Sequence, residues 1–110
     1  MMRDLDSLFD SIKELKDNWN GYGAKSFNPL FVEKCRGIIK ELNYSPFVVP
    51  TANNSIQIEY TNNHGYLEIE IFEDSAKVFK LGSNHETFSF RLLSVDSLSL
   101  NMVIDSFFHN

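Results

Sequence analysis

The stretch Trp19-Asn20-Gly21-Tyr22-Gly23-Ala24 separates two helical patterns from a part of the chain that alternates like a sheet. It is the only tight run of two aromatic residues and two glycines in the sequence. Gly21 and Gly23 can adopt positive φ at little cost, so a compact reversal of the chain is easy here. We therefore expect a loop at this stretch, with Trp19 mostly buried between the two helices that it joins.

Two amphipathic helices are predicted on either side of this loop. The first runs from about Asp4 to Asp17, where apolar residues recur at spacings of three and four. The second begins at Asn28-Pro29, a capping residue followed by proline at the first helical position, and stops near Asn43. The expected buried stripes are Leu5, Leu8, Phe9, Ile12 and Leu15 in the first helix and Phe31, Cys35, Ile38, Ile39 and Leu42 in the second.

The period of the apolar pattern then changes from that of a helix to that of a strand. Pro50 places the first strand at a sheet edge. Several residues from Ser94 to Ser97 can cap a final helix, whose stripe includes Leu100 and Phe107. The sequence thus predicts one α+β domain over residues 1–110 in the order α-α-β-β-β-β-β-α, an antiparallel meander with helices on one face. The expected strands are Phe47–Val49, Ser55–Thr61, Tyr66–Phe72, Ala76–Leu81 and Glu86–Leu92.

The register of the hairpin around Asn62–Gly65 stays open. A four-residue loop would pair Ile58 with Ile69, and Glu59 with Glu68. A two-residue loop at Asn62-Asn63 would instead pair Ile58 with Leu67. Both registers keep the apolar side chains on one face, so the pattern does not choose between them.

For the next hairpin, a three-residue loop at residues 73–75 is the interpretation we follow. This register would turn Phe79 and Leu81 toward the helices. It would turn Val78 away from them and set Lys80 on the outer face of the sheet.

The composition is that of an ordinary globular protein. Apolar residues make up 43% of the chain and charged residues 23%, with a formal net charge of −5. An acidic chain argues against direct binding of nucleic acid, which needs a basic patch, and it suits docking on a basic surface of another protein. The single cysteine and the lack of an apolar leader or spanning segment indicate a cytoplasmic protein with no membrane contact.

The order of motifs resembles a group of small bacterial and phage proteins. These carry an amphipathic helix, then Trp-x-Gly-Tyr-Gly-Ala, then a second helix and two strands rich in Ile and Glu. Here those parts are Trp19–Ala24, Pro50-Thr51, Ile56–Tyr60 and Leu67–Ile71, so the resemblance covers roughly residues 5 to 80. Where the group usually has a glycine in its first hairpin turn, this chain has Asn53-Asn54. The resemblance implies an accessory gene of a mobile element and supplies no catalytic residue.

No motif for catalysis, metal binding or a cofactor is legible. His64 and His85 lie in predicted turns and His109 near the C-terminus, without the spacing of metal ligands. Cys35 lies on an apolar helix stripe, where a thiol is usually inert packing. We therefore expect no enzyme activity, no metal and no cofactor.

The candidate binding residues lie mainly on one face of the predicted sheet. Period-2 alternation puts Glu59, Glu68 and Glu70 on one face, together with Tyr66 and Phe72, if the apolar alternates face the helices. Such a partly apolar, acidic face is typical of a protein-binding surface or a dimer interface. Tyr22 in the loop is a further candidate, since tyrosine is common among interface anchors.

These patterns predict a non-catalytic protein-binding module of a mobile element. It would inhibit or neutralise another macromolecule, as anti-defence and antitoxin-like proteins do, through an acidic and aromatic surface. The alternatives are a small enzyme that uses the sheet-face carboxylates and a purely structural homodimer.

Overall fold

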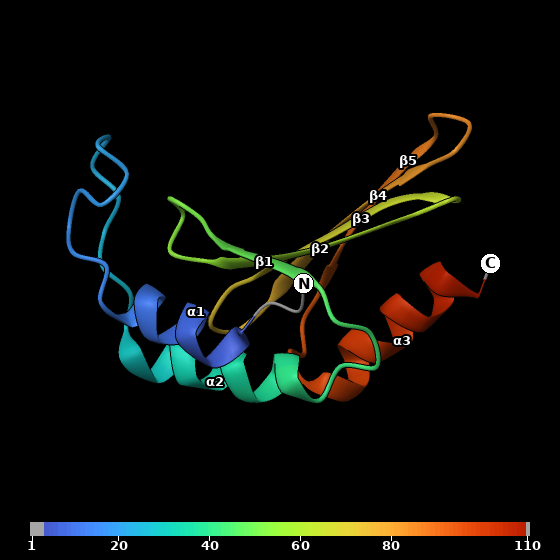
Figure 1. Cartoon of the computed structure of the whole chain (residues 1–110). Helices are drawn as coiled ribbons and strands as arrows, with labels where there is room; N and C mark the ends of the chain where they lie inside the picture. Colours follow the sequence, from blue (N-terminus) through green and yellow to red (C-terminus); the bar gives the residue numbers. More distant parts are fainter. Residues whose placement is uncertain (1–3, 110) are drawn as a thin grey trace.

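All three helices pack on one face of a five-stranded antiparallel sheet (Figure 1). The computed structural model describes residues 4–109. The strands follow one another across the sheet in chain order, so the sheet is a meander. The α+β fold and element order predicted from the sequence are therefore confirmed. The elements are α1 Leu5–Lys13, α2 Pro29–Lys40, β1 Phe47–Pro50, β2 Ile56–Asn62, β3 Gly65–Ile71, β4 Ala76–Gly82, β5 Thr87–Leu92 and α3 Ser97–Phe108.

Each helix begins where a side chain accepts hydrogen bonds from backbone N–H groups that the first turn leaves unpaired. Asp4 caps α1, Asn28 caps α2 and Asp96 caps α3. The α1 helix ends at Lys13, earlier than the predicted end at Asp17. Asp17 belongs to the following loop, because its carboxylate accepts a hydrogen bond from the backbone N–H of Ser26.

Ion pairs join α1 and α2 on their exposed sides. Arg36 contacts Glu33 on its own helix and both Asp6 and Asp10 on α1. The ammonium of Lys13 lies 2.7 Å from the Glu33 carboxylate. Hydrogen bonds from Arg36 and Lys13 lower the pKa of Glu33 to about 2. The folded protein therefore favours the charged form of this carboxyl group.

The low pKa of Glu33 predicts a small loss of stability in acid. Because the folded pKa lies below the unfolded value, the contribution is complete above that unfolded value and is lost as the pH falls toward 2. The urea midpoint of Glu33→Gln should fall less than that of the wild-type protein between about pH 5 and pH 2. Glu14→Gln, which removes an exposed charge at the end of α1, should follow the wild type. Equal pH slopes for Glu33→Gln and the wild type would contradict this assignment.

The hairpin between β2 and β3 takes one of the two registers left open by the sequence. Ile58 pairs with Ile69, and Asn62 pairs with Gly65 at the turn. The backbone N–H of His64 donates to the side chain of Asn62 and closes the turn. The apolar alternates of both strands therefore face the helices.

The predicted register of the next hairpin is wrong by one residue. Val78 pairs with Ile69 and is 2% exposed, so it faces the helices. Phe79 and Leu81 consequently lie on the opposite face, and Lys80 lies on the helix side. The loop holds four residues instead of three, and the Phe72 N–H donates to the Ser75 carbonyl across it. A shift of one residue moves every side chain of a strand to the other face.

The helix side of the sheet, here called the inner face, is buried across four strands and opens at the fifth. In one row across β1–β4, each residue is at most 2% exposed. This row consists of Val48, Ile58, Ile69 and Val78. Phe90 continues this row on β5 and is 47% exposed. The helices therefore cover the sheet only as far as β4.

Gly65 is required by the packing of β3 on β4. Its φ is +138°, a conformation that L side chains rarely adopt, and an added Cβ would overlap the backbone carbonyl of Leu81. Gly65→Ala should therefore lower the free energy of unfolding by more than about 1 kcal/mol. Gly37→Ala is the matched control, because this helical glycine has open space at the Cβ position and should gain about 1 kcal/mol. Urea unfolding of the two variants measures the difference, and a neutral Gly65→Ala would contradict it.

Candidate functional site

The sheet face opposite the helices, here called the outer face, is left uncovered by them (Figure 1). The strand register arranges its side chains in rows that cross the sheet. The central row is Phe47, Glu59, Glu68, Phe79 and Ser89. The row on one side is Val49, Gln57, Glu70, Lys77 and Arg91, and the row on the other is Thr61, Tyr66, Leu81 and Thr87.

Two glutamates stand directly opposite each other in the central row. Glu59 on β2 pairs with Glu68 on β3, and both side chains are partly buried by their neighbours. Directly opposed Cβ atoms lie about 5 Å apart, and like charges in this arrangement are destabilising. The structure thus brings together two of the predicted binding residues in an electrostatically unfavourable pair.

Neighbouring side chains hold the two carboxylates in place. The hydroxyl of Tyr66 donates a 2.8 Å hydrogen bond to Glu68, and the amide of Gln57 donates one of the same length to Glu59. Burial, followed by the hydrogen bond to Glu68, raises the pKa of Tyr66. The hydroxyl therefore stays protonated and remains a donor at neutral pH.

Glu70 belongs to a different row and has different partners. Its carboxylate accepts hydrogen bonds from Ser55 and Asn53 in the β1–β2 connection. Its cross-strand neighbour on β4 is Lys77, which in turn stands opposite Arg91 on β5. The outer face is therefore acidic on β2 and β3 and basic at one corner of β4 and β5.

Two aromatic residues that the sequence did not assign to this face flank the acidic pair. Phe47 follows Glu59 toward the β1 edge and is 55% exposed, and Phe79 stands opposite Glu68 on β4. The Phe79 ring also lies 6.5 Å from that of Tyr66. Phe79 was missed because the wrong register of β4 turned it inward. The alternation of β4 gave no signal for the correct face, because Lys80 shares a face with Val78 while Phe79 and Leu81 lie on the other.

Phe72 lies at the border of the outer face. It follows the last residue of β3, is half-buried, and has the ammonium of Lys77 5.6 Å from its ring centroid. It therefore marks the turn between β3 and β4, away from the central row.

The loop of residues 18–24 has the compact reversal expected from its glycines, both of which adopt positive φ. The Asn20 side chain accepts hydrogen bonds from the N–H groups of Tyr22 and Ala24. The Asn54 side chain donates to the carbonyl of Ser26, which ties the end of this connection to the turn between β1 and β2. The loop is thus held beside the sheet, but its residues are not part of the outer face.

The two aromatic residues of the loop have different surroundings. Trp19 is only partly buried, and its ring lies 6.2 Å from that of Phe27. Its indole N–H donates to the backbone carbonyl of Lys25. Tyr22 is 93% exposed. The prediction that Trp19 is mostly buried between the two helices is therefore wrong. Its ring is only partly buried and supports the loop through Phe27 and Lys25, whereas Tyr22 is free of packing.

The different burial of Trp19 and Tyr22 gives a test of which residue stabilises the loop. Trp19→Ala should lower the free energy of unfolding by about 3 kcal/mol, the lower end of the range for large aromatic truncations, because the ring is only partly buried. Tyr22→Ala should change it by no more than about 0.5 kcal/mol. Thermal or urea unfolding of both variants distinguishes them. Similar losses in the two variants would contradict the role given to Trp19.

The histidines and the cysteine lie away from the central row. His64 and His85 occupy the β2–β3 and β4–β5 turns, and His109 caps the end of α3. Burial raises the pKa of Cys35 to about 12. Among residues 4–109, no three His, Cys, Asp or Glu side chains are grouped so that they could hold a metal ion. In the same residues, no helix is long and apolar enough to cross a membrane.

Comparison of the chain with protein-family models, curated proteins and solved structures gives no significant match. The resemblance carried by Trp19–Ala24 therefore stays a prediction from the motif.

Proposed function

We propose that this chain is a non-catalytic protein-binding module that uses its outer face to dock on a basic surface of another protein. The observation that carries the proposal is the opposed pair Glu59 and Glu68 in the central row, with Phe47 and Phe79 beside it. The pair lies on a face that the helices leave open (Figure 1).

The acidic pair is better suited to a complex than to the free protein. Opposed glutamates cost a few tenths of a kcal/mol in a sheet. A lysine or arginine side chain placed between Glu59 and Glu68 would remove that repulsion and gain charge-assisted hydrogen bonds. The hydroxyl of Tyr66 holds one of the two carboxylates in a fixed position, so less side-chain freedom is lost when the cation binds.

The neighbouring rings supply the apolar part of the surface. Phe47 and Phe79 stand on either side of the pair, and Tyr66 and Leu81 fill the next row. Aromatic rings are frequent anchors of interfaces, and their faces attract guanidinium and ammonium groups. Apolar contact would provide affinity, whereas the charges would speed encounter and select a basic partner.

The basic corner formed by Lys77 and Arg91 makes the charge distribution of the outer face asymmetric. A partner whose positive patch meets β2 and β3 avoids like-charge contact with β4 and β5. The face therefore favours one orientation of its partner, and like-charge contacts oppose the reverse one.

The biological setting is proposed from the resemblance to accessory proteins of bacteria and phages. In that setting an acidic module would inhibit or neutralise another macromolecule, as anti-defence and antitoxin-like proteins do. A basic protein surface that otherwise holds nucleic acid is the target that fits the charge of this face.

The test is the loss of binding when the acidic pair is neutralised. The tagged chain is used to capture a partner from host lysate, and the affinity is then measured with the purified partner. Glu59→Gln with Glu68→Gln should weaken binding at least about tenfold, or 1.4 kcal/mol, and should reduce its salt dependence. Glu14→Gln with Glu41→Gln removes the same charge from the helix layer and should leave affinity nearly unchanged.

The same variants check the fold independently. The Glu59/Glu68 double variant should be as stable as the wild-type protein or more stable by a few tenths of a kcal/mol, because a repulsion is removed. Unchanged affinity and salt dependence in this folded variant would show that the outer face is not the docking surface.

A further inference from the structure

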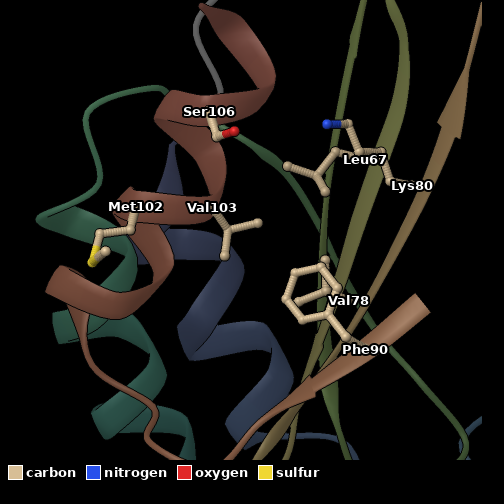
Figure 2. A pocket seen from close by; sticks show the side chains of 7 residues that line it. All are labelled: Leu67, Val78, Lys80, Phe90, Met102, Val103 and Ser106. Atoms are coloured by element: carbon tan, nitrogen blue, oxygen red, sulfur yellow. The ribbon is translucent and has the colours of Figure 1, made fainter. Parts of the chain in front are cut away.

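An apolar groove opens on the inner face between α3 and strands β3–β5 (Figure 2). Its volume is about 270 Å³, and its apolar lining consists of Leu67, Val78, Phe90, Met102 and Val103. Lys80 and Ser106 add polar atoms, and Figure 2 shows Ser106 on α3 and Lys80 on the sheet side. The groove ends at β5, where Phe88 and Phe90 are 58% and 47% exposed.

The β5 strand is also an edge of the sheet, and it is less protected than the opposite edge. Natural sheets protect their edges with short strands, proline or charged side chains. The opposite edge, β1, has four residues and ends in Pro50. The β5 strand has six residues and no proline, its one charged residue is Arg91 on the outer face, and its inward side chains are Phe88, Phe90 and Leu92. A strand of this kind can pair with another strand along its free edge.

The hydrogen-bond pattern shows which backbone groups of β5 are available. The Gly82 N–H donates to the Glu86 carbonyl, so this pair belongs to the bonded set of the β4–β5 ladder. Bonded and non-bonded pairs alternate in antiparallel sheets. Phe88 and Phe90 therefore direct their N–H and carbonyl groups to β4. Ser89, like Thr87 and Arg91, directs these groups away from the sheet.

We propose that two copies of this chain associate through antiparallel pairing of their β5 strands. The two five-stranded sheets then form one continuous sheet, with Ser89 of each copy at the two-fold axis. The two grooves meet beneath the joined strands and are closed by the aromatic side chains of both copies.

The sequence of β5 is compatible with its own antiparallel copy. Centring the pair on Ser89 places Phe88 opposite Phe90 of the second copy, and the reverse contact follows from the symmetry. These pairs are of the non-bonded type, in which side chains approach most closely. Arg91 then stands opposite Thr87 of the second copy, so the register opposes no like charges.

Apolar side chains at this edge and on α3 would supply a large part of the surface that a dimer buries. Met102 lines the groove with Phe90, and Leu98 lies one turn earlier on α3. Given about 200 Å² for a large apolar side chain, the exposed parts of five such side chains amount to at most roughly 650 Å² per copy. Standard interfaces bury about 800 Å² per partner, and the backbone of the paired strand supplies much of the remainder. The exposed side chains are Phe88, Phe90, Leu93, Leu98 and Met102.

Proline at position 89 tests the proposal with little effect on the fold. Ser89→Pro removes an N–H group that points away from β4, and proline is tolerated at edge strands. Ser89→Ala keeps the N–H group and is the matched control. Sedimentation equilibrium of the full chain from about 1 to 500 μM measures association. The wild type and Ser89→Ala should reach twice the monomer mass, and Ser89→Pro should dissociate at least tenfold more readily.

A second variant keeps the test decisive if Ser89→Pro does not fold. Phe88→Lys places a charge in the proposed contact at a position that is already exposed, and it should also give a monomer. A wild-type chain that stays monomeric over the whole concentration range would overturn the proposal. The β5 edge would then bind a different strand or ligand. A dimer that persists in both variants would overturn it as well. The Glu59/Glu68 variant should still dimerise, so the outcome is separate from that of the proposed function.

Discussion

How far the helices cover the inner face of the sheet determines which other surfaces stay exposed. A sheet must bury one face against another layer, and here that layer reaches from Val48 on β1 to Val78 on β4. The row is closed to solvent up to that point and open at Phe90 on β5. The fold thus leaves two kinds of uncovered surface, an entire outer face and the inner side of one edge strand.

The outer face and the inner side of β5 differ in the kinds of side chain that they expose. The outer face combines charged side chains with aromatic rings, so it remains compatible with water in the free protein. The inner side of β5 continues the core pattern and ends in Phe88 and Phe90. Joining the edges of two copies about an axis normal to the sheet would leave both outer faces on the same side. A partner with repeated basic patches would then meet two acidic rows and gain avidity without new contacts.

The sequence was sufficient for the order of the elements, but it left the β2–β3 register open and gave the wrong β3–β4 register. Caps such as Asn28-Pro29 and the alternation of β2 and β3 are local signals, and the structure follows them. The β3–β4 loop is different. Phe72 fits the alternation of β3 equally well as the last residue of that strand, before a three-residue loop, or as the first residue of a four-residue loop. The Phe72–Ser75 backbone bond and the packing of Val78 against the core decide the matter. That one-residue error moved Phe79 to the wrong face and hid an aromatic neighbour of the acidic pair.

Stability of the free sheet does not explain the central row. Neutral polar residues occupy the same face at Gln57 and Thr61 on β2, so this face does not need a carboxylate at Glu59. The hydrogen bonds from Gln57 and Tyr66 could be accepted by an uncharged amide oxygen in place of either carboxylate. What two carboxylates add is a concentrated negative charge at a fixed position between aromatic rings. In the free protein that charge costs stability, so we propose that it serves to bind a positively charged group that is not part of this chain.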